Sequence, residues 1–180
     1  MSKILLKNAL MDLLDETKNI QKISVRSICE RAELNRSTFY AHYSEPKELL
    51  LEIEDELIDE TSAHLEKIGK GEENSAMIYL LSFLSYIRHN DRPFRTLLLS
   101  SSDPGFRDRF MQMAMLRLVE YMDLTLDETI EQYVYSYIMN GSFSIITQWI
   151  RSGYSVDERK LLQLLFTLNK NTLSNGIVND

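Results

Sequence analysis

Apolar residues recur at helical spacing along most of this chain, and no other feature constrains its fold as strongly. From Ile4 to about Thr17, for example, Leu6, Leu10 and Leu14 fall on one helical face. Alternating runs typical of strands are nearly absent, and the 180 residues include only three prolines and six glycines. The sequence therefore predicts an all-α fold of about nine helices.

The segment from residue 24 to residue 47 predicts two short helices joined by a tight turn. Ser24 can cap a helix over 25–32, because its hydroxyl can accept from a free N–H at the helix start. Residues 33–35 then form the turn, and Asn35 can cap a helix from Arg36 to about Tyr43. This geometry is that of a helix-turn-helix, whose second helix enters the major groove of DNA. With the first helix, the segment predicts a three-helix DNA-binding head.

Basic and hydroxyl side chains gather at the start of the second of these helices. An arginine there can read guanine, and hydroxyls can donate to bases or phosphates. Tyr40 and His42 follow on the exposed side, where they suit phosphate and sugar contacts. The predicted DNA contacts are Ser24, Arg26, Asn35, Arg36, Ser37, Thr38, Tyr40, His42 and Lys47.

The net charge of −7 argues at first against a nucleic-acid partner, but the charge is unevenly distributed. Residues 1–47 carry eight Lys and Arg against six Asp and Glu, a net charge of +2. The remaining residues carry twelve against twenty-one, a net charge of −9. Because phosphates are neutralised contact by contact, an acidic body is compatible with a DNA-binding head.

These residues resemble the TetR family of transcriptional regulators over 4–65. The resemblance rests on the first helix, on I-S-V-R-S-I-C-E-R-A at 23–32, on R-S-T-F-Y-A-H-Y at 36–43, and on K-E-L-L at 47–50. It implies a homodimer formed by the last two helices, a ligand cavity in the body, and a fourth helix that transmits ligand binding to the spacing of the two heads. It also implies a repressor and a near-palindromic operator.

Two residues depart from the pattern of that family. Glu33 stands in the turn where the family usually has glycine, and a left-handed backbone there costs a side chain about 1 kcal/mol. Pro46 stands where the family usually has a phosphate-contacting lysine, and Lys47 follows one residue later. Proline also lacks the backbone N–H that could serve a phosphate at a helix start. Both departures predict weakened DNA binding.

The body is also predicted to be helical, and we expect two domains. Residues 1–47 form the DNA-binding domain, a helix over about 46–68 connects it, and 48–180 form the sensing and dimerisation domain. Beyond a break at 69–74 the predicted helices are 75–89, about 93–101, 105–123, 127–152 and 157–172. The segment 75–89 is apolar on almost every face, which predicts a helix buried on all sides.

The body resembles more loosely a TetR subgroup that includes a coactivator of dihydroxyacetone kinase genes. That likeness rests on D-P-G-F-R at 103–107 and on a spaced pattern in the helix over 127–152 and the glycine after it: Tyr135, Gly141, Ile145, Trp149, Ile150 and Gly153. Methionine and aromatic residues predict a pocket lined by Phe110, Met111, Met115, Met122, Tyr133 and Tyr137. The predicted dimer interface is formed by Gly141, Ile145, Trp149, Leu161, Leu165 and Leu168.

Two functions stay open, and an enzyme is not expected. The first is a homodimeric regulator controlled by an effector in its body; the alternative is a coactivator or adaptor of the same fold controlled by a protein partner. We expect no catalytic residue, metal or cofactor, because nucleophile, phosphate-loop and ligand spacings are missing. Cys29, the single cysteine, is predicted to be a buried, inert thiol in a cytoplasmic protein without a membrane span.

Overall fold

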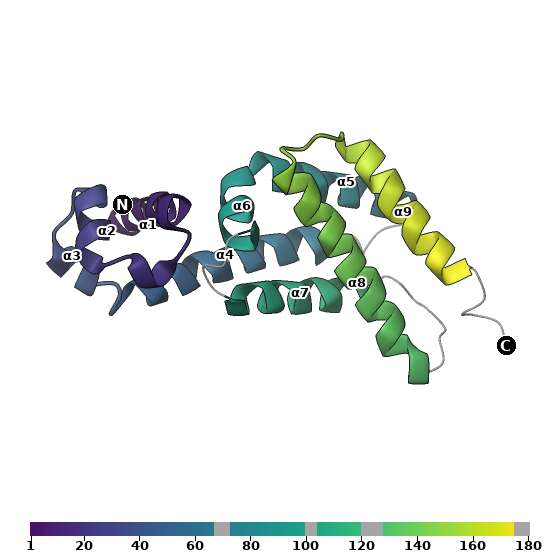
Figure 1. Cartoon of the computed structure of the whole chain (residues 1–180), viewed down its shortest axis with the longest axis horizontal. Coiled ribbons are helices and arrows are strands. Elements are labelled where there is room, and N and C mark those ends of the chain that lie inside the picture. The colour runs from purple at the N-terminus through teal and green to yellow at the C-terminus, as the bar shows by residue number, and fades with distance from the viewer. Residues whose placement is uncertain (67–72, 100–103, 120–127, 175–180) are drawn as a thin grey trace. The chain divides into compact units, whose positions relative to one another are not determined.

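The computed structural model describes residues 1–66, 73–99, 104–119 and 128–174 (Figure 1). Within these ranges the chain forms nine α-helices, one short 3-10 helix and no strand, so the all-α prediction is confirmed. The helices are α1 (Ser2–Thr17), the 3-10 turn η1 (Ile20–Lys22), α2 (Val25–Ala32), α3 (Arg36–Tyr40), α4 (Pro46–Glu66), α5 (Glu73–His89), α6 (Asp91–Leu99), α7 (Pro104–Val119), α8 (Glu128–Arg151) and α9 (Glu158–Ser174). Among them, none is both long enough and apolar enough to cross a membrane.

The chain divides into two compact units. The head unit comprises Met1–Glu60 and Arg92–Asp108, and the body unit comprises Thr61–Asp91 and Arg109–Asp180. Most of α6 therefore belongs to the same unit as the first three helices, although it follows them by more than fifty residues in the sequence.

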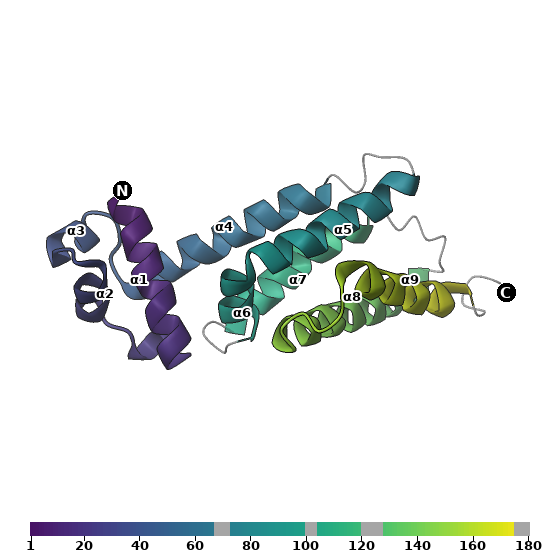
Figure 2. The same ribbon diagram turned by 90° about the horizontal axis from the view of Figure 1, so that it is seen from above.

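The core of the head unit is built on one face of α1. Figure 2 shows α1 beside α2 and α3, and α1 packs directly against α2. Burying one such aliphatic side chain contributes about 1.5–3 kcal/mol, so this face fixes how the short helices lie. The fully buried side chains of this core include Leu6, Leu10, Leu14, Ile28, Phe39, Leu49 and Leu50.

Helix α2 is capped at both ends by its own side chains and backbone. The Ser24 hydroxyl accepts from the Ser27 N–H at 3.1 Å, and the Ser27 hydroxyl accepts from the Ser24 N–H at 3.1 Å. At the other end Leu34 N–H donates to the Cys29 carbonyl and Glu33 N–H to the Glu30 carbonyl, which is a Schellman motif. The predicted cap at Ser24 is thus confirmed, and the helix has the predicted bounds.

Helix α3 is shorter than predicted: it ends at Tyr40 instead of about Tyr43. The N–H groups of His42 and Tyr43 both donate to the Phe39 carbonyl, so the chain tightens into a turn there. Asn35 has the extended backbone of an N-cap, but its side chain makes no capping hydrogen bond. The aromatic side chain of Phe39, fully buried, holds the short helix in place.

In the body unit α9 packs on α5 and on α8. The prediction that the segment 75–89 is buried on all sides is wrong, because Met77 and Ile78 are 42% and 66% exposed. Phe83, Leu84 and Ile87 do enter the core, whereas Leu80 and Leu81 are half-buried. That core includes Phe83, Leu84 and Ile87 of α5, Val134, Tyr135, Ile138, Met139 and Phe143 of α8, and Leu161, Leu162 and Leu165 of α9.

The turn between α8 and α9 is closed by glycine and by aromatic contacts. Gly153 has φ of 68°, and Tyr154 N–H donates to the Trp149 carbonyl, a second Schellman motif. The Trp149 indole donates to the Val156 carbonyl at 2.6 Å, and the Tyr154 hydroxyl donates to Asp91 at 2.5 Å. The prediction that Gly153 follows the end of this helix is confirmed.

Candidate nucleic-acid interface

The exposed face of α3 carries the residues predicted to read DNA. Arg36 and Ser37 are exposed, Tyr40 is 58% exposed, and Thr38 is half-buried. Tyr40 meets the edge of the buried Phe39 ring, with ring centroids 5.7 Å apart and planes at 87°. Because Phe39 anchors the opposite side, the helix can present Arg36, Ser37 and Tyr40 together to a ligand in solution.

The start of α2 offers a second group of predicted contacts. Ser24 is exposed, but its hydroxyl already caps the helix. Arg26 is exposed and pairs with Glu30 one turn later at 2.6 Å. A phosphate contact by Arg26 therefore requires the guanidinium to exchange the Glu30 carboxylate for the phosphate, which costs little at an exposed pair.

The segment after α3 places His42 and Lys47 at the surface. The His42 ring nitrogen Nε2 lies 2.9 Å from the Ser2 hydroxyl, a contact between the start of α1 and the end of the helix-turn-helix. Pro46 is the first residue of α4, as predicted. Glu48 accepts from both the N–H and the hydroxyl of Ser44, which lowers the pKa of its carboxyl.

Glu33 adopts the left-handed conformation that the sequence suggested, with φ of 55° and ψ of 39°. The Schellman motif at the end of α2 requires this conformation, which is why glycine is the less costly residue there. The strain that the sequence predicted at this position is therefore present in the backbone.

A cluster of charges joins α1 to α4 behind the helix-turn-helix. Lys7 contacts Glu52 at 2.8 Å and Glu56 at 2.5 Å, and Lys3 contacts Glu52 at 2.9 Å. The hydrogen bond from Lys7, with burial opposing it and Lys3 adding to it, holds the pKa of Glu52 at about 2. Burial, followed by the nearby Glu52 carboxylate, raises the pKa of Tyr43 to about 12.

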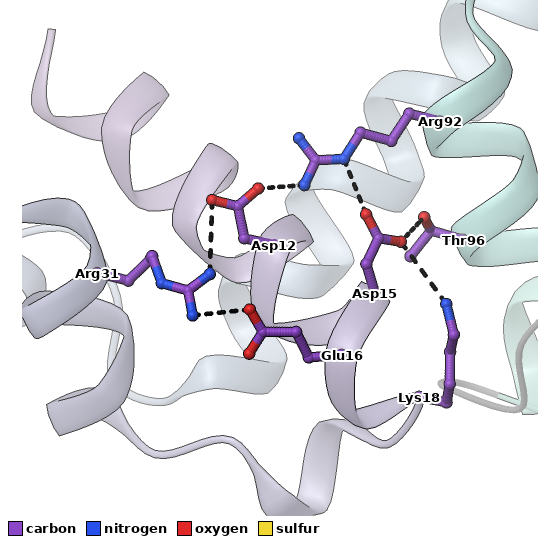
Figure 3. A network of polar contacts seen from close by, with 7 residues as sticks. All are labelled: Asp12, Asp15, Glu16, Lys18, Arg31, Arg92 and Thr96. Atoms are coloured by element: carbon purple, nitrogen blue, oxygen red, sulfur yellow. Dashed lines mark hydrogen bonds and ion pairs between the residues drawn. The ribbon is translucent and has the colours of Figure 1, made fainter.

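A second polar network joins α1 to α2 and to α6 (Figure 3). Arg92 of α6 binds Asp12, and its Nε lies 2.9 Å from Asp15. The Thr96 hydroxyl donates to the other oxygen of Asp15 at 2.5 Å. On the far side of α1, Arg31 of α2 lies 2.8 Å from Glu16 and 3.8 Å from Asp12.

The sequence placed most of the predicted DNA contacts at exposed positions, but it did not predict these connecting networks. Their partners lie as far as 81 residues apart, as in the Thr96–Asp15 pair, so no local spacing reveals them. Ser27 was missed for a different reason: a capping box usually carries Glu or Gln at that position. The prediction that Cys29 is buried is confirmed, since it is 4% exposed, and burial raises the pKa of its thiol.

The predicted pocket residues do not gather around one interior site within the described chain. Phe110 is buried, with its ring centroid 6.4 Å from that of Phe143, and Met111 is half-buried. Met115 is 37% exposed, and Tyr133 and Tyr137 are 68% and 66% exposed. Met122 lies outside the described residues.

The predicted dimer residues fall into two groups. Trp149, Leu161 and Leu165 are at most 9% exposed and belong to the core of a single chain. The other three lie nearer the surface: Gly141 and Leu168 are exposed and Ile145 is half-buried. A side chain added at Gly141 would meet nothing within 4 Å in one chain.

The body matches a known family of regulators. A family model described as a transcriptional regulator C-terminal region, of the TetR type, matches residues 74–171, which is more than half of the chain. No curated protein sequence gives a significant match.

Two solved structures share the whole fold. A TetR transcriptional regulator from Streptococcus agalactiae is 26% identical, covers 93% of both chains and superposes with a TM-score of 0.69. The dihydroxyacetone kinase operon activator DhaS is 17% identical, covers 96% of both chains and has a TM-score of 0.60, which shows a shared fold. Since the family model spans most of the body and the fold agrees along the chain, this protein belongs to the TetR family of transcriptional regulators.

Proposed function

We propose that the chain is a DNA-binding regulator of transcription that reads its operator with α3. The observation that carries the proposal is the exposed group Arg36, Ser37 and Tyr40 on a helix anchored by the buried Phe39. Arginine can donate two hydrogen bonds to guanine in the major groove, and the hydroxyls suit bases or phosphates. The cap of α2 and the turn at Glu33 support the proposal, because they fix the angle between α2 and α3.

The regulator acts as a homodimer through α8 and α9. Apolar side chains remain exposed on both helices of the single chain: Tyr133, Tyr137, Leu164 and Leu168, from 46% to 68% exposed. Gly141 shares the exposed side of α8 with the two tyrosines and leaves room for close approach of a second helix. Two heads then bind two half-sites, so the operator is near-palindromic.

An effector bound to the body controls this binding by favouring one of two arrangements of the dimer. A repressor is the form that the family resemblance implies. The alternative is control by a protein partner, and one observation favours it: Met77 and Ile78 of α5 and Leu116 of α7 are large apolar side chains exposed on the body unit. DhaS, which shares the fold, is described as an activator.

The test is selection of genomic DNA fragments by the purified protein, followed by titration of a selected fragment with wild type and with Arg36→Ala/Tyr40→Ala. We expect wild type to bind at nanomolar to sub-micromolar concentration and the double variant to lose at least about a hundredfold, since one bidentate base contact is worth about 1–3 kcal/mol. Both side chains are exposed, so the melting temperature should stay unchanged.

The matched control is Arg159→Ala, which removes one exposed arginine from α9 and changes the net charge equally. It should bind the fragment like wild type. If Arg36→Ala/Tyr40→Ala keeps wild-type affinity and selectivity, α3 does not read the operator and the proposal fails.

A further inference from the structure

Helix α6 is held on α1 by a side chain that reaches two carboxylates. The Arg92 guanidinium binds Asp12 through Nη2 and Asp15 through Nε. Asp12 and Asp15 are one helical turn apart on α1, so the planar fork of an arginine can span them with two different nitrogens. Thr96, one turn further along α6, fixes the second oxygen of Asp15 (Figure 3).

The same carboxylates continue the connection to α2. The Asp12 oxygen that does not face Arg92 lies 3.8 Å from Arg31, and Arg31 also contacts Glu16. Arg31 lies in the last turn of α2, directly before the turn that leads to α3. A continuous chain of polar contacts therefore runs from the first turn of α6 through α1 to the helix-turn-helix.

These contacts suit a positional role better than a stabilising one. The side chains of Arg92, Arg31 and Asp12 are 46%, 36% and 40% exposed. Ion pairs at this exposure contribute little to the free energy of unfolding. The network also includes Asp15, Glu16 and Lys18. Its three positive and three negative charges balance, so the net charge of the network is zero.

We propose that Arg92 is a positioning residue for DNA binding: it sets where α1 and α2 lie by holding them on the first turn of α6. This inference rests on the proposed function, because it assigns the network a role in presenting α3 to DNA. Arg92 is also where the chain enters the head unit, and the residue before it, Asp91, is held in the body unit by the Tyr154 hydroxyl. The contacts of Arg92 thereby connect the first turn of α6 to α1 and α2 within the head unit.

The first test needs no DNA. Hydrogen exchange is measured on the full-length wild type, on Arg92→Gln and on the control Arg88→Gln. Arg88 is matched in exposure, 47% against 46%, and pairs with Glu158 within the body unit. Arg92→Gln should speed exchange of the amides at the end of α1 and in α2 about threefold to tenfold, as expected for loss of exposed pairs in a network. Arg88→Gln should leave these amides unchanged, and Thr96→Val should repeat the Arg92→Gln pattern in weaker form.

The second test uses a selected DNA fragment. A head that is less well ordered binds with a larger entropy cost, so Arg92→Gln should weaken binding about threefold to tenfold while the melting temperature stays near that of wild type. The loss should vanish when Asp12→Asn/Asp15→Asn is already present, because Arg92 then has no carboxylates to hold.

The outcomes separate this inference from the proposed function. Unchanged exchange in α1 and α2 of Arg92→Gln overturns the positioning role, whether or not the protein binds DNA. Absence of DNA binding by wild type sinks the proposed function, and the positioning role for DNA binding fails with it, even if the exchange data show that Arg92 orders the head. A third outcome is that Arg92→Gln lowers the affinity for DNA equally in the wild type and in Asp12→Asn/Asp15→Asn. That result shows that Arg92 acts on DNA binding without these carboxylates, and it also overturns the inference.

Discussion

Glu33 combines two costs in one residue: a left-handed backbone and a negative charge near α3, the helix proposed to read DNA. The backbone cost belongs to stability, because every side chain with a Cβ is strained there. The charge cost belongs to DNA binding, because it repels phosphate. Two substitutions separate them.

We predict that Glu33→Gly raises the free energy of unfolding by about 0.5–1 kcal/mol. Glycine relieves the backbone strain, and its greater conformational freedom in the unfolded chain offsets part of that gain. Glu33→Gln keeps the strain and should leave stability unchanged. Both should tighten DNA binding. Urea unfolding at pH 7 and DNA titration measure the two effects, and equal stabilisation by Glu33→Gln would show that charge, not backbone, is the cost.

Glu52 predicts a pH-dependent contribution to stability. Its pKa is about 2 in the folded chain, below the ordinary value of 4.5, so its contribution is fully present above pH 4.5. The contribution falls as pH drops toward 2, because the unfolded chain then binds the proton more readily. Glu52→Gln should cost about 1 kcal/mol at pH 7 and progressively less below pH 4.5.

The control for Glu52 is Glu30→Gln, which breaks the fully exposed pair with Arg26. It should change stability little at any pH. Urea unfolding between pH 7 and pH 2.5 checks both variants. A cost of Glu52→Gln that does not shrink with falling pH contradicts the role of its ionised form.

At the scale of single elements, the short helix α2 depends on its ends more than on its length. An isolated helix of this size is unstable in water. The capping box at Ser24 and Ser27 and the Schellman motif at Glu33 therefore determine where α2 begins and ends and stabilise it. The sequence could predict the Ser24 cap because the signal is local. It could not predict where α3 ends, because that depends on how the Phe39 carbonyl is shared in the turn.

We predict that Ser24→Ala lowers the free energy of unfolding by about 1 kcal/mol, the usual cost of losing an N-cap. Ser27→Ala removes the hydrogen bonds between its hydroxyl and Ser24. It should cost less, because the Ser27 N–H keeps the Ser24 hydroxyl as its acceptor. Ser37→Ala, at an exposed position in α3, serves as the control and should be neutral to stability. Urea unfolding followed by circular dichroism measures all three, and a neutral Ser24→Ala would mean that α2 is held by packing alone.

At the scale of the whole molecule, sequence periodicity predicted every α-helix of the described ranges but not the 3-10 turn η1. In α8 and α9 it did not predict which side chains are buried. The sequence predicts Trp149 and Leu165 at a dimer interface, yet both are buried in the core of the single chain. Tyr133 and Tyr137 look like pocket residues, yet they are exposed. Burial depends on the neighbouring helix, and a single sequence carries little information about that neighbour.

Dimerisation is therefore predicted to use the exposed side of α8 and α9. Tyr137→Glu should give a monomer at micromolar concentration, because a charge in an apolar interface is costly to bury. Leu116→Glu is matched, since Leu116 of α7 is 64% exposed and Tyr137 is 66% exposed. It should stay dimeric in sedimentation experiments. Wild-type behaviour of Tyr137→Glu would place the interface elsewhere.

A hydroxyl-radical footprint of the protein on a DNA fragment selected from the genome tests whether two α3 helices read the operator. We predict two protected stretches, related by near-palindromic symmetry and separated by one helical turn of about 10 base pairs or a multiple of it. Both should disappear with Arg36→Ala/Tyr40→Ala and persist with Arg159→Ala. Protection that is unchanged in the double variant, or a single protected stretch without symmetry, would contradict the reading of DNA by two α3 helices of a dimer.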